Sequence, residues 1–243
     1  MADVFQWEGY CPICQKATTF RAENAWLRDH LHCMSCPRGS IPRERAMKVV
    51  LDRLVPRWRE CAIHESSPAD RGLSLILKDE CRGYVASQFF PNGTPGSLYN
   101  GYRCEDLERQ TFASETFDVV ITQDVMEHVF QPDAAYREMY RTLRAGGLHI
   151  HTTPIYKDKV TSERRAAREN GKIIHLVDPP EYHGNPIDAA GSLVTFHYGY
   201  DLPDLIQGWA GFDVEVVRFN DRRHGIVGEF TEVIVCRRPA SIG

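Results

Sequence analysis

The sequence predicts an α/β protein with a doubly wound, mostly parallel sheet of seven strands, preceded by a small metal-binding module. From about residue 60, short apolar runs of strand length alternate with amphipathic runs of helix length, which is typical of a parallel sheet covered on both faces. Before that point, four cysteines form two CxxC pairs, a spacing typical of zinc sites. We therefore expect a zinc-binding module at 1–40, a linking helix at 41–59 and a main domain at 60–243.

Composition narrows the classes of function. Hydrophobic residues make up 42% of the chain and charged residues 26%, as in ordinary globular proteins. The longest apolar runs are strand-sized and the N-terminus lacks a secretory pattern, so we expect a cytoplasmic protein without membrane contacts. Residues 1–60 hold ten Lys and Arg against seven Asp and Glu within a net charge of −4. This imbalance is too small to favour a nucleic-acid partner, although one is possible.

The metal ligands expected in the first module are Cys11, Cys14, Cys33 and Cys36. Two CxxC turns can complete a tetrahedron of thiolates, which leaves no open position and so predicts a structural zinc. Iron in the same site and a redox dithiol are the alternatives. The scattered cysteines at 61, 81, 104 and 236 are interpreted as small buried hydrophobes.

The linking helix follows the cysteines. Ser40 is a plausible cap and Pro42 suits the first helical turn. Apolar side chains recur at helical spacing at Met47, Val50, Leu51 and Leu54, and Val55-Pro56 ends or kinks the helix.

In the main domain we expect strands at 62–64, 83–87, 117–122, 148–152, 214–219 and 232–236, and helices at 73–77, 133–143 and 202–209. Gly146-Gly147 is expected to close the second of these helices. The last two strands lack an intervening helix, which suggests an antiparallel finish. In such sheets ligands bind beyond the carboxyl ends of the strands.

Residues 117–147, FDVVITQDVMEHVFQPDAAYREMYRTLRAGG, resemble the fourth strand and following helix of class I, Rossmann-like S-adenosylmethionine-dependent methyltransferases of the type 11 group. The run 104–108, CEDLE, is similar to the segment that surrounds the adenine ring in that family. The resemblance covers roughly residues 60 to 155. It implies a methyltransferase with S-adenosylmethionine as cofactor.

The resemblance also implies a set of cofactor-binding residues. Glu65 stands where the family binds the methionine amino group, while Ser66, Ser67 and Gly72 replace its glycine-rich turn. Gln88 replaces the acidic residue that holds the ribose. The full implied set is Glu65, Ser66, Ser67, Gly72, Gln88, Glu105, Asp106, Leu107, Gln123 and Asp124.

The acceptor side is less defined. His128 is a candidate general base, because its pKa lies near neutrality, although a pocket-wall role is equally open. Residues 156–200 form an insertion, whose basic first part at 156–172 reads as a solvated helix or loop, or as a lid for an anionic acceptor. Tyr182, His183 and His197 are the substrate-side candidates, with loop packing as the alternative role.

These features favour methyl transfer to a small polar or glycan-like acceptor. One alternative is an RNA or protein methyltransferase whose module presents a basic face made of Arg21, Arg28, Arg38, Arg43 and Arg45. The other is a non-catalytic binding protein on a decayed fold. The sequence leaves the acceptor atom and the oligomeric state open.

Overall fold

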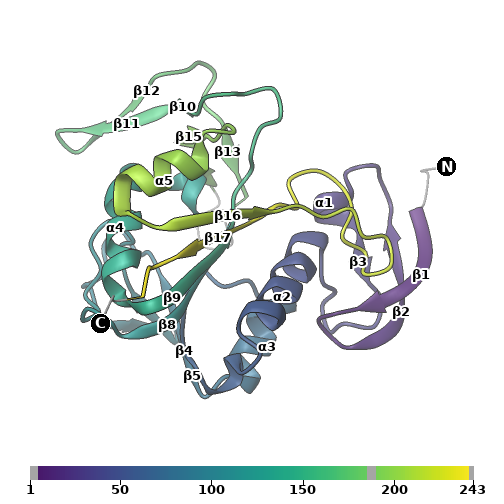
Figure 1. Cartoon of the computed structure of the whole chain (residues 1–243). Helices are drawn as coiled ribbons and strands as arrows, with labels where there is room; N and C mark the ends of the chain where they lie inside the picture. The colour runs from purple at the N-terminus through teal and green to yellow at the C-terminus, as the bar shows by residue number, and fades with distance from the viewer. Residues whose placement is uncertain (1–4, 185–189, 241–243) are drawn as a thin grey trace.

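The computed structural model describes residues 5–184 and 190–240. Its central sheet has eight strands in the order β16-β17-β9-β8-β4-β5-β7-β6 (Figure 1). The strands are β4 (Ala62–Ser66), β5 (Gly83–Gln88), β6 (Leu98–Tyr99), β7 (Tyr102–Cys104), β8 (Phe117–Gln123), β9 (Leu143–Thr152), β16 (Asp213–Val217) and β17 (Val233–Arg237). The inner strands are parallel, and β16 and β17 finish the sheet antiparallel, as predicted. The eighth strand is β6, a short antiparallel partner of β7.

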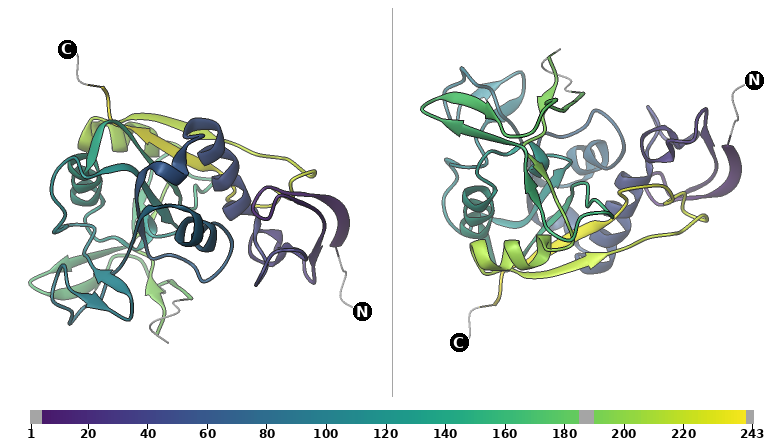
Figure 2. Two further views of the ribbon diagram at one scale, coloured as in Figure 1. Left: turned by 90° about the horizontal axis from the view of Figure 1, so that it is seen from below. Right: turned by 90° about the horizontal axis from the view of Figure 1, so that it is seen from above.

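Helices cover both faces of this sheet (Figure 2). They are α2 (Pro42–Leu54) and α3 (Gly72–Glu80) on one face, and α4 (Pro132–Thr142) and α5 (Leu202–Ala210) on the other. Successive side chains of β8 point to opposite faces of the sheet and contribute to both cores. Val119 and Ile121 pack with α2 and α3, whereas Val120 packs with α4 and α5. Each such buried aliphatic side chain contributes roughly 1.5–3 kcal/mol to folding.

Two local predictions need correction. Helix α2 begins after Ile41 and not after Ser40, because the Glu44 carboxylate accepts a hydrogen bond from the Ile41 amide at 3.1 Å. Helix α4 ends at Thr142, and Gly146-Gly147 lies within β9 instead of closing the helix. There Gly146 has a φ of +79°, and a Cβ on Gly147 would approach two backbone oxygens to about 3.0 Å. The two glycines therefore allow the backbone conformation and close packing near the start of β9.

The N-terminal module is a three-stranded antiparallel sheet with a short helix. Its elements are β1 (Phe5–Cys11), β2 (Lys16–Ala22), α1 (Leu27–His30) and β3 (His32–Cys33). The loop between β16 and β17 reaches across to this module (Figures 1 and 2). Trp7 donates its ring N–H to the Arg222 carbonyl at 2.8 Å, and the Tyr10 amide donates to the Arg223 carbonyl at 2.8 Å. The module is thus tied to the far end of the chain.

The insertion after β9 is built from short strands. They are β10 (Glu163–Arg164), β11 (Ala166–Glu169), β12 (Lys172–His175), β13 (Tyr182–His183), β14 (Ser192–Leu193) and β15 (Phe196–His197). Strands β11 and β12 form a hairpin, so the described part of 156–172 contains strand and turn where a solvated helix was one expectation. Single-turn 3-10 helices occur at η1 (Trp58–Glu60) and η2 (Met126–His128). Across the described residues, no helix combines the length and apolarity needed to cross a bilayer.

Candidate functional site

The carboxyl ends of β4, β5 and β8 meet at one edge of the sheet. Ser66 at the end of β4 lies in register with Ser87 on one side and Thr122 on the other. The strand order runs outward in opposite directions from the β4–β8 pair, and this reversal is where open α/β sheets bind ligands. The predicted cofactor residues cluster at this edge.

Glu65 is fully buried beneath the edge. Its carboxylate accepts hydrogen bonds from Ser74 at 2.7 Å, from Tyr84 at 2.7 Å and from the Gln123 amide at 2.9 Å. Burial raises the pKa of Glu65, and these donors oppose that rise. The carboxylate therefore joins α3, β5 and β8 in this structure, and binding of an amino group requires it to exchange partners.

The first loop of the sheet, between β4 and α3, depends on Gly72 for close packing. Gly72 has a φ of +55°, and a Cβ there would lie 2.1 Å from a carboxylate oxygen of Glu44. Ser67 also has a positive φ of 56°, and its amide donates to the Ser87 carbonyl at 2.8 Å. Ser66 is buried and Ser67 is half-buried. Gly72 thus allows α3 to approach α2 closely.

The two acidic residues after β7 have different surroundings. Glu105 is buried and accepts hydrogen bonds from the Arg103 side chain at 2.6 Å and the Thr111 amide at 2.7 Å. Asp106 instead lines a cavity of about 250 Å³ at the edge of β5 and β7. The cavity is also lined by Phe89, Phe90, Pro91, Gly93, Pro95, Cys104 and Arg109. Leu107 is buried in the core that contains α4 and α5. An exposed aromatic ring beside a carboxylate suits a planar base that carries an amino group.

Sequence reasoning missed Phe89, although its position directly after the predicted second strand was a usable signal. Gln88, the last residue of β5, is half-buried, and its carbonyl accepts from the Glu105 amide at 3.1 Å. The cavity therefore begins where both β5 and β7 end.

Asp124, which follows β8, receives two arginines from the N-terminal part of the chain. Arg28 donates a hydrogen bond to its carboxylate, and the Arg43 Nε lies 3.1 Å from it. Thr152 donates to the other oxygen at 2.8 Å. Burial raises the pKa of Asp124, but Arg43 and Arg28 outweigh burial and hold that pKa below its usual range. The sequence predicts neither arginine at this site, because both are candidates for an exposed basic face.

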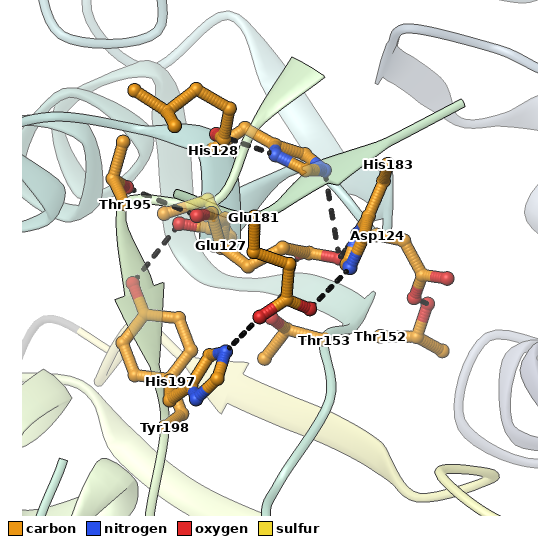
Figure 3. A network of polar contacts seen from close by, with 12 residues as sticks. Asp124, Glu127, His128, Thr152, Thr153, Glu181, His183, Thr195, His197 and Tyr198 are labelled. Atoms are coloured by element: carbon orange, nitrogen blue, oxygen red, sulfur yellow. Dashed lines mark hydrogen bonds and ion pairs between the residues drawn. The ribbon is translucent and has the colours of Figure 1, made fainter. Parts of the chain in front are cut away.

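Glu127 and two histidines converge beside Asp124 (Figure 3). Glu127 and His128 lie in η2, and His183 lies in β13 of the insertion. One oxygen of Glu127 lies 3.9 Å from Nε2 of His128 and 4.0 Å from Nδ1 of His183. Burial, followed by the nearby Asp124 charge, raises the pKa of Glu127 to about 7. Burial lowers the pKa of His128, so its imidazole is neutral near pH 7.

The other substrate-side candidates lie apart from that convergence. His197 is buried, stacks on Tyr156 with ring centroids 4.0 Å apart, and contacts Glu181 at 2.7 Å. Tyr182 is half exposed at the outside of β13. Glu181 contacts His183 at 3.2 Å as well as His197, and sequence reasoning did not select it. Its only signal was its place in a loop rich in His and Tyr.

The four predicted metal ligands lie together, with their Sγ atoms within 4.8 Å of one another. The Cys11–Cys36 and Cys14–Cys33 sulfur distances are 3.6 and 3.9 Å. A tetrahedron with Zn–S bonds of about 2.3 Å has edges of about 3.8 Å. The donor set and its spacing therefore fit zinc.

Comparisons with known proteins agree with this architecture. Residues 84–151 match the methyltransferase domain family. The chain superposes on an S-adenosylmethionine-dependent methyltransferase from Mesorhizobium loti with a TM-score of 0.51 at 14% identity, covering 79% of this chain and 98% of that one. The chain has the class I methyltransferase fold.

This methyltransferase fold also superposes on an amino pentose methyltransferase from Micromonospora echinaspora, with a TM-score of 0.52 at 14% identity over 83% of this chain and 93% of that one. In sequence, 52 residues are 45% identical to the ubiquinone biosynthesis O-methyltransferase of Parvibaculum lavamentivorans. That match spans 21% of each chain, about a fifth of the curated relative's length. The family match runs from β5 to β9 and so includes the cavity edge, Asp124 and Glu127.

Proposed function

We propose that the protein is an S-adenosylmethionine-dependent methyltransferase that acts on a small polar or glycan-like acceptor. The observation that carries the proposal is the methyltransferase domain match over 84–151. It spans the strand ends that surround the cavity beside Asp106 and the cluster at Glu127.

The cofactor is assigned to the edge formed by the carboxyl ends of β8, β4, β5 and β7. When bound, S-adenosylmethionine supplies an electrophilic methyl group on its sulfonium. We assign its adenine to the cavity, with Phe89 stacking on the ring and Asp106 accepting from the amino group. Gln88 is assigned to the ribose. The methionine end is then assigned to the first loop, Glu65, Ser66, Ser67 and Gly72, with Gln123 and Asp124 closing the site from β8.

The acceptor is assigned to the side of Asp124 that the insertion covers. His128 donates its Nδ1 hydrogen to the Leu193 carbonyl at 2.9 Å, because a carbonyl oxygen can only accept. Its Nε2 therefore holds a lone pair and can take a proton from an acceptor hydroxyl. His183 and Glu181 add polar groups suited to a hydroxylated acceptor. Transfer itself needs mainly alignment and exclusion of water.

Zinc in the four-cysteine cluster is proposed to be structural. Four thiolates close the coordination shell, and the module contains too few buried residues to fold without support. Through Arg28, the module would also help Arg43 of α2 to hold Asp124 in place.

The arrangement of the arginines weighs against a macromolecular acceptor gripped by this module. Arg45 is fully buried and donates to the Gly225 and Leu31 carbonyls at 2.8 and 2.9 Å. Arg28 and Arg43 point inward to Asp124. Of the five arginines expected on a basic face, only Arg21 and Arg38 are exposed, and each pairs with a carboxylate.

Calorimetric titration of S-adenosylmethionine and S-adenosylhomocysteine, with zinc assayed on the same sample, tests the proposal. We expect micromolar binding that Phe89→Ala weakens about tenfold, since stacking on a base contributes about 1–3 kcal/mol. Leu98→Ala, an equally apolar and more exposed truncation outside the cavity, is the matched control. Absence of binding by folded, zinc-loaded protein would instead support the non-catalytic binding protein.

A further inference from the structure

We infer that Glu127, His128 and His183 form a second metal site, distinct from the four cysteines, which binds a divalent first-row ion such as Zn²⁺. Their ligand atoms all lie within 4.8 Å of one another. Two imidazoles and one carboxylate are a common ligand set for catalytic zinc, in which three protein ligands leave a position open. The binding of the ion does not depend on the proposed function.

One oxygen of the buried Glu127 carboxylate is an acceptor without a donor among the described residues. The Glu127 side chain is 2% exposed, and Thr153 donates to one of its oxygens at 2.9 Å. The other oxygen has no hydrogen-bond partner among residues 5–184 and 190–240. A buried carboxylate oxygen left without a donor or cation is costly, so a positive partner is expected at that point.

The two imidazoles are oriented by acceptors on their outer nitrogens. The Leu193 carbonyl fixes the hydrogen of His128 on Nδ1. The Glu181 carboxylate, 3.2 Å from Nε2 of His183, fixes the hydrogen of that ring on Nε2. Both remaining nitrogens, Nε2 of His128 and Nδ1 of His183, thus direct lone pairs toward the unpartnered Glu127 oxygen (Figure 3).

No hydrogen bond closes these gaps, because 3.9 and 4.0 Å exceed the range for N–H···O or O–H···N contacts. A proton on Glu127 could satisfy at most one imidazole. An ion with bonds of about 2.1 Å to three tetrahedral ligands needs atom separations of about 3.4 Å, so the two Glu127–histidine separations need to shorten by about half an ångström. Anchoring of each outer imidazole hydrogen by a carbonyl or carboxylate is the usual support for metal-bound histidine.

Such an ion would lie beside Asp124, at the position proposed for the acceptor. If the methyltransferase proposal holds, the ion would replace His128 as the group that activates the acceptor, because the Nε2 lone pair would be bound to the metal. The acceptor hydroxyl would then bind at the open position with a lowered pKa and lose its proton to water, leaving Asp124 to its two arginines. The acceptors favoured by this arrangement are hydroxyl groups with a second oxygen nearby, such as vicinal diols or catechols, which can reach the ion with two atoms.

The test is titration of Co²⁺ into the full chain, after dialysis against a weak chelator that leaves the four-cysteine metal in place. We expect one further equivalent to bind, with visible bands that lack the intense thiolate charge-transfer absorption of a cysteine site. His183→Asn, a partly exposed position, should weaken this binding at least tenfold, whereas His175→Asn on exposed β12 should leave it unchanged.

Absence of a second equivalent at millimolar Co²⁺, or equal binding by wild type and His183→Asn, would overturn the site. His128→Asn provides an independent second variant with the same expectation as His183→Asn. Co²⁺ binding is measured without S-adenosylmethionine, so its failure is distinguishable from failure of cofactor binding. Co²⁺ binding without cofactor binding would leave the metal site standing and remove only its proposed role.

Discussion

The four-cysteine cluster and the Glu127–His128–His183 cluster are two candidate metal sites with opposite construction. The cysteines come from one short stretch, 11–36, and their sulfurs already have tetrahedral spacing. The second cluster joins η2 to β13, and its atoms stand slightly too far apart. A local motif can thus hold a closed structural ion, whereas an open site is assembled by tertiary packing around a buried, unpartnered carboxylate.

The largest expected effect comes from the closed site. Cys33→Ser should unfold the N-terminal module, because structural zinc contributes about 10–16 kcal/mol of apparent binding energy in small modules. Zinc content and thermal denaturation by circular dichroism measure the effect. Cys61→Ser, a half-buried singleton outside the cluster, should retain zinc and melt near the wild-type temperature; equal behaviour of the two variants would refute a structural ion.

The contact between the module and the site should give the next largest effect. Arg28→Met leaves the buried Asp124 carboxylate with Arg43 alone, and loss of one partner of a buried pair costs roughly 3–5 kcal/mol. Urea denaturation should show this loss in the free energy of unfolding. Arg21→Met, which removes an exposed pair with Glu23, should change it by less than about 1 kcal/mol. A stable Arg28→Met protein would mean that the two regions are energetically independent.

Acid should destabilise the fold through buried histidines of the core, which lie outside the Glu127–His128–His183 cluster. Burial lowers the pKa of His64 and of His151 to about 3, whereas the unfolded value is about 6.5. Below pH 6.5 the unfolded chain binds these protons and the folded chain does not, so stability present above pH 6.5 is lost as pH falls toward 3. Each histidine contributes up to about 1.4 kcal/mol per pH unit in that window.

Urea denaturation at pH 7.0 and 5.5 measures this dependence. His151→Gln should reduce the slope between the two values, while His175→Gln on exposed β12 should not. An unchanged slope in His151→Gln would show that folding does not lower the pKa of this ring.

The smallest expected effect concerns the support of His183. Glu181→Gln keeps an acceptor beside Nε2 but removes the charge, so Co²⁺ affinity should fall about tenfold, as for other partners of metal-bound histidine. Glu169→Gln, on the exposed hairpin, is the matched control and should leave affinity unchanged. No loss in Glu181→Gln would show that the carboxylate does not orient the ring.

Much of the fold was predictable because its signals are local. The apolar run of β8 and the helical spacing at Met47, Val50 and Leu51 required no tertiary information. The expectation that Gly146-Gly147 closes α4 was wrong, because such a pair suits a helix end as well as a strand start. Strands β6 and β7 were missed because two or three residues carry no periodicity.

The candidate site was only partly predictable, for a physical reason. Asp106 and Asp124 follow strands, and that position alone indicates the ligand edge. Of the neighbouring acids Glu105 and Asp106, only Asp106 lines the cavity. Glu105 instead accepts hydrogen bonds from Arg103 and Thr111, and these contacts cannot be read from the sequence. Likewise, the sequence shows that Arg28 is charged, but it does not show that Arg28 pairs with Asp124, a residue 96 positions away.

The buried guanidinium of Arg45 has a consequence for synthesis on the ribosome. Its carbonyl partner Gly225 lies 180 positions later in the chain, which corresponds to a delay of roughly 10–40 s at ordinary translation rates. During that interval the N-terminal module and α2 have emerged, but the Arg45 guanidinium lacks the carbonyl that accepts its hydrogen bond. The first part of this protein to be made is therefore among the last to reach its final packing.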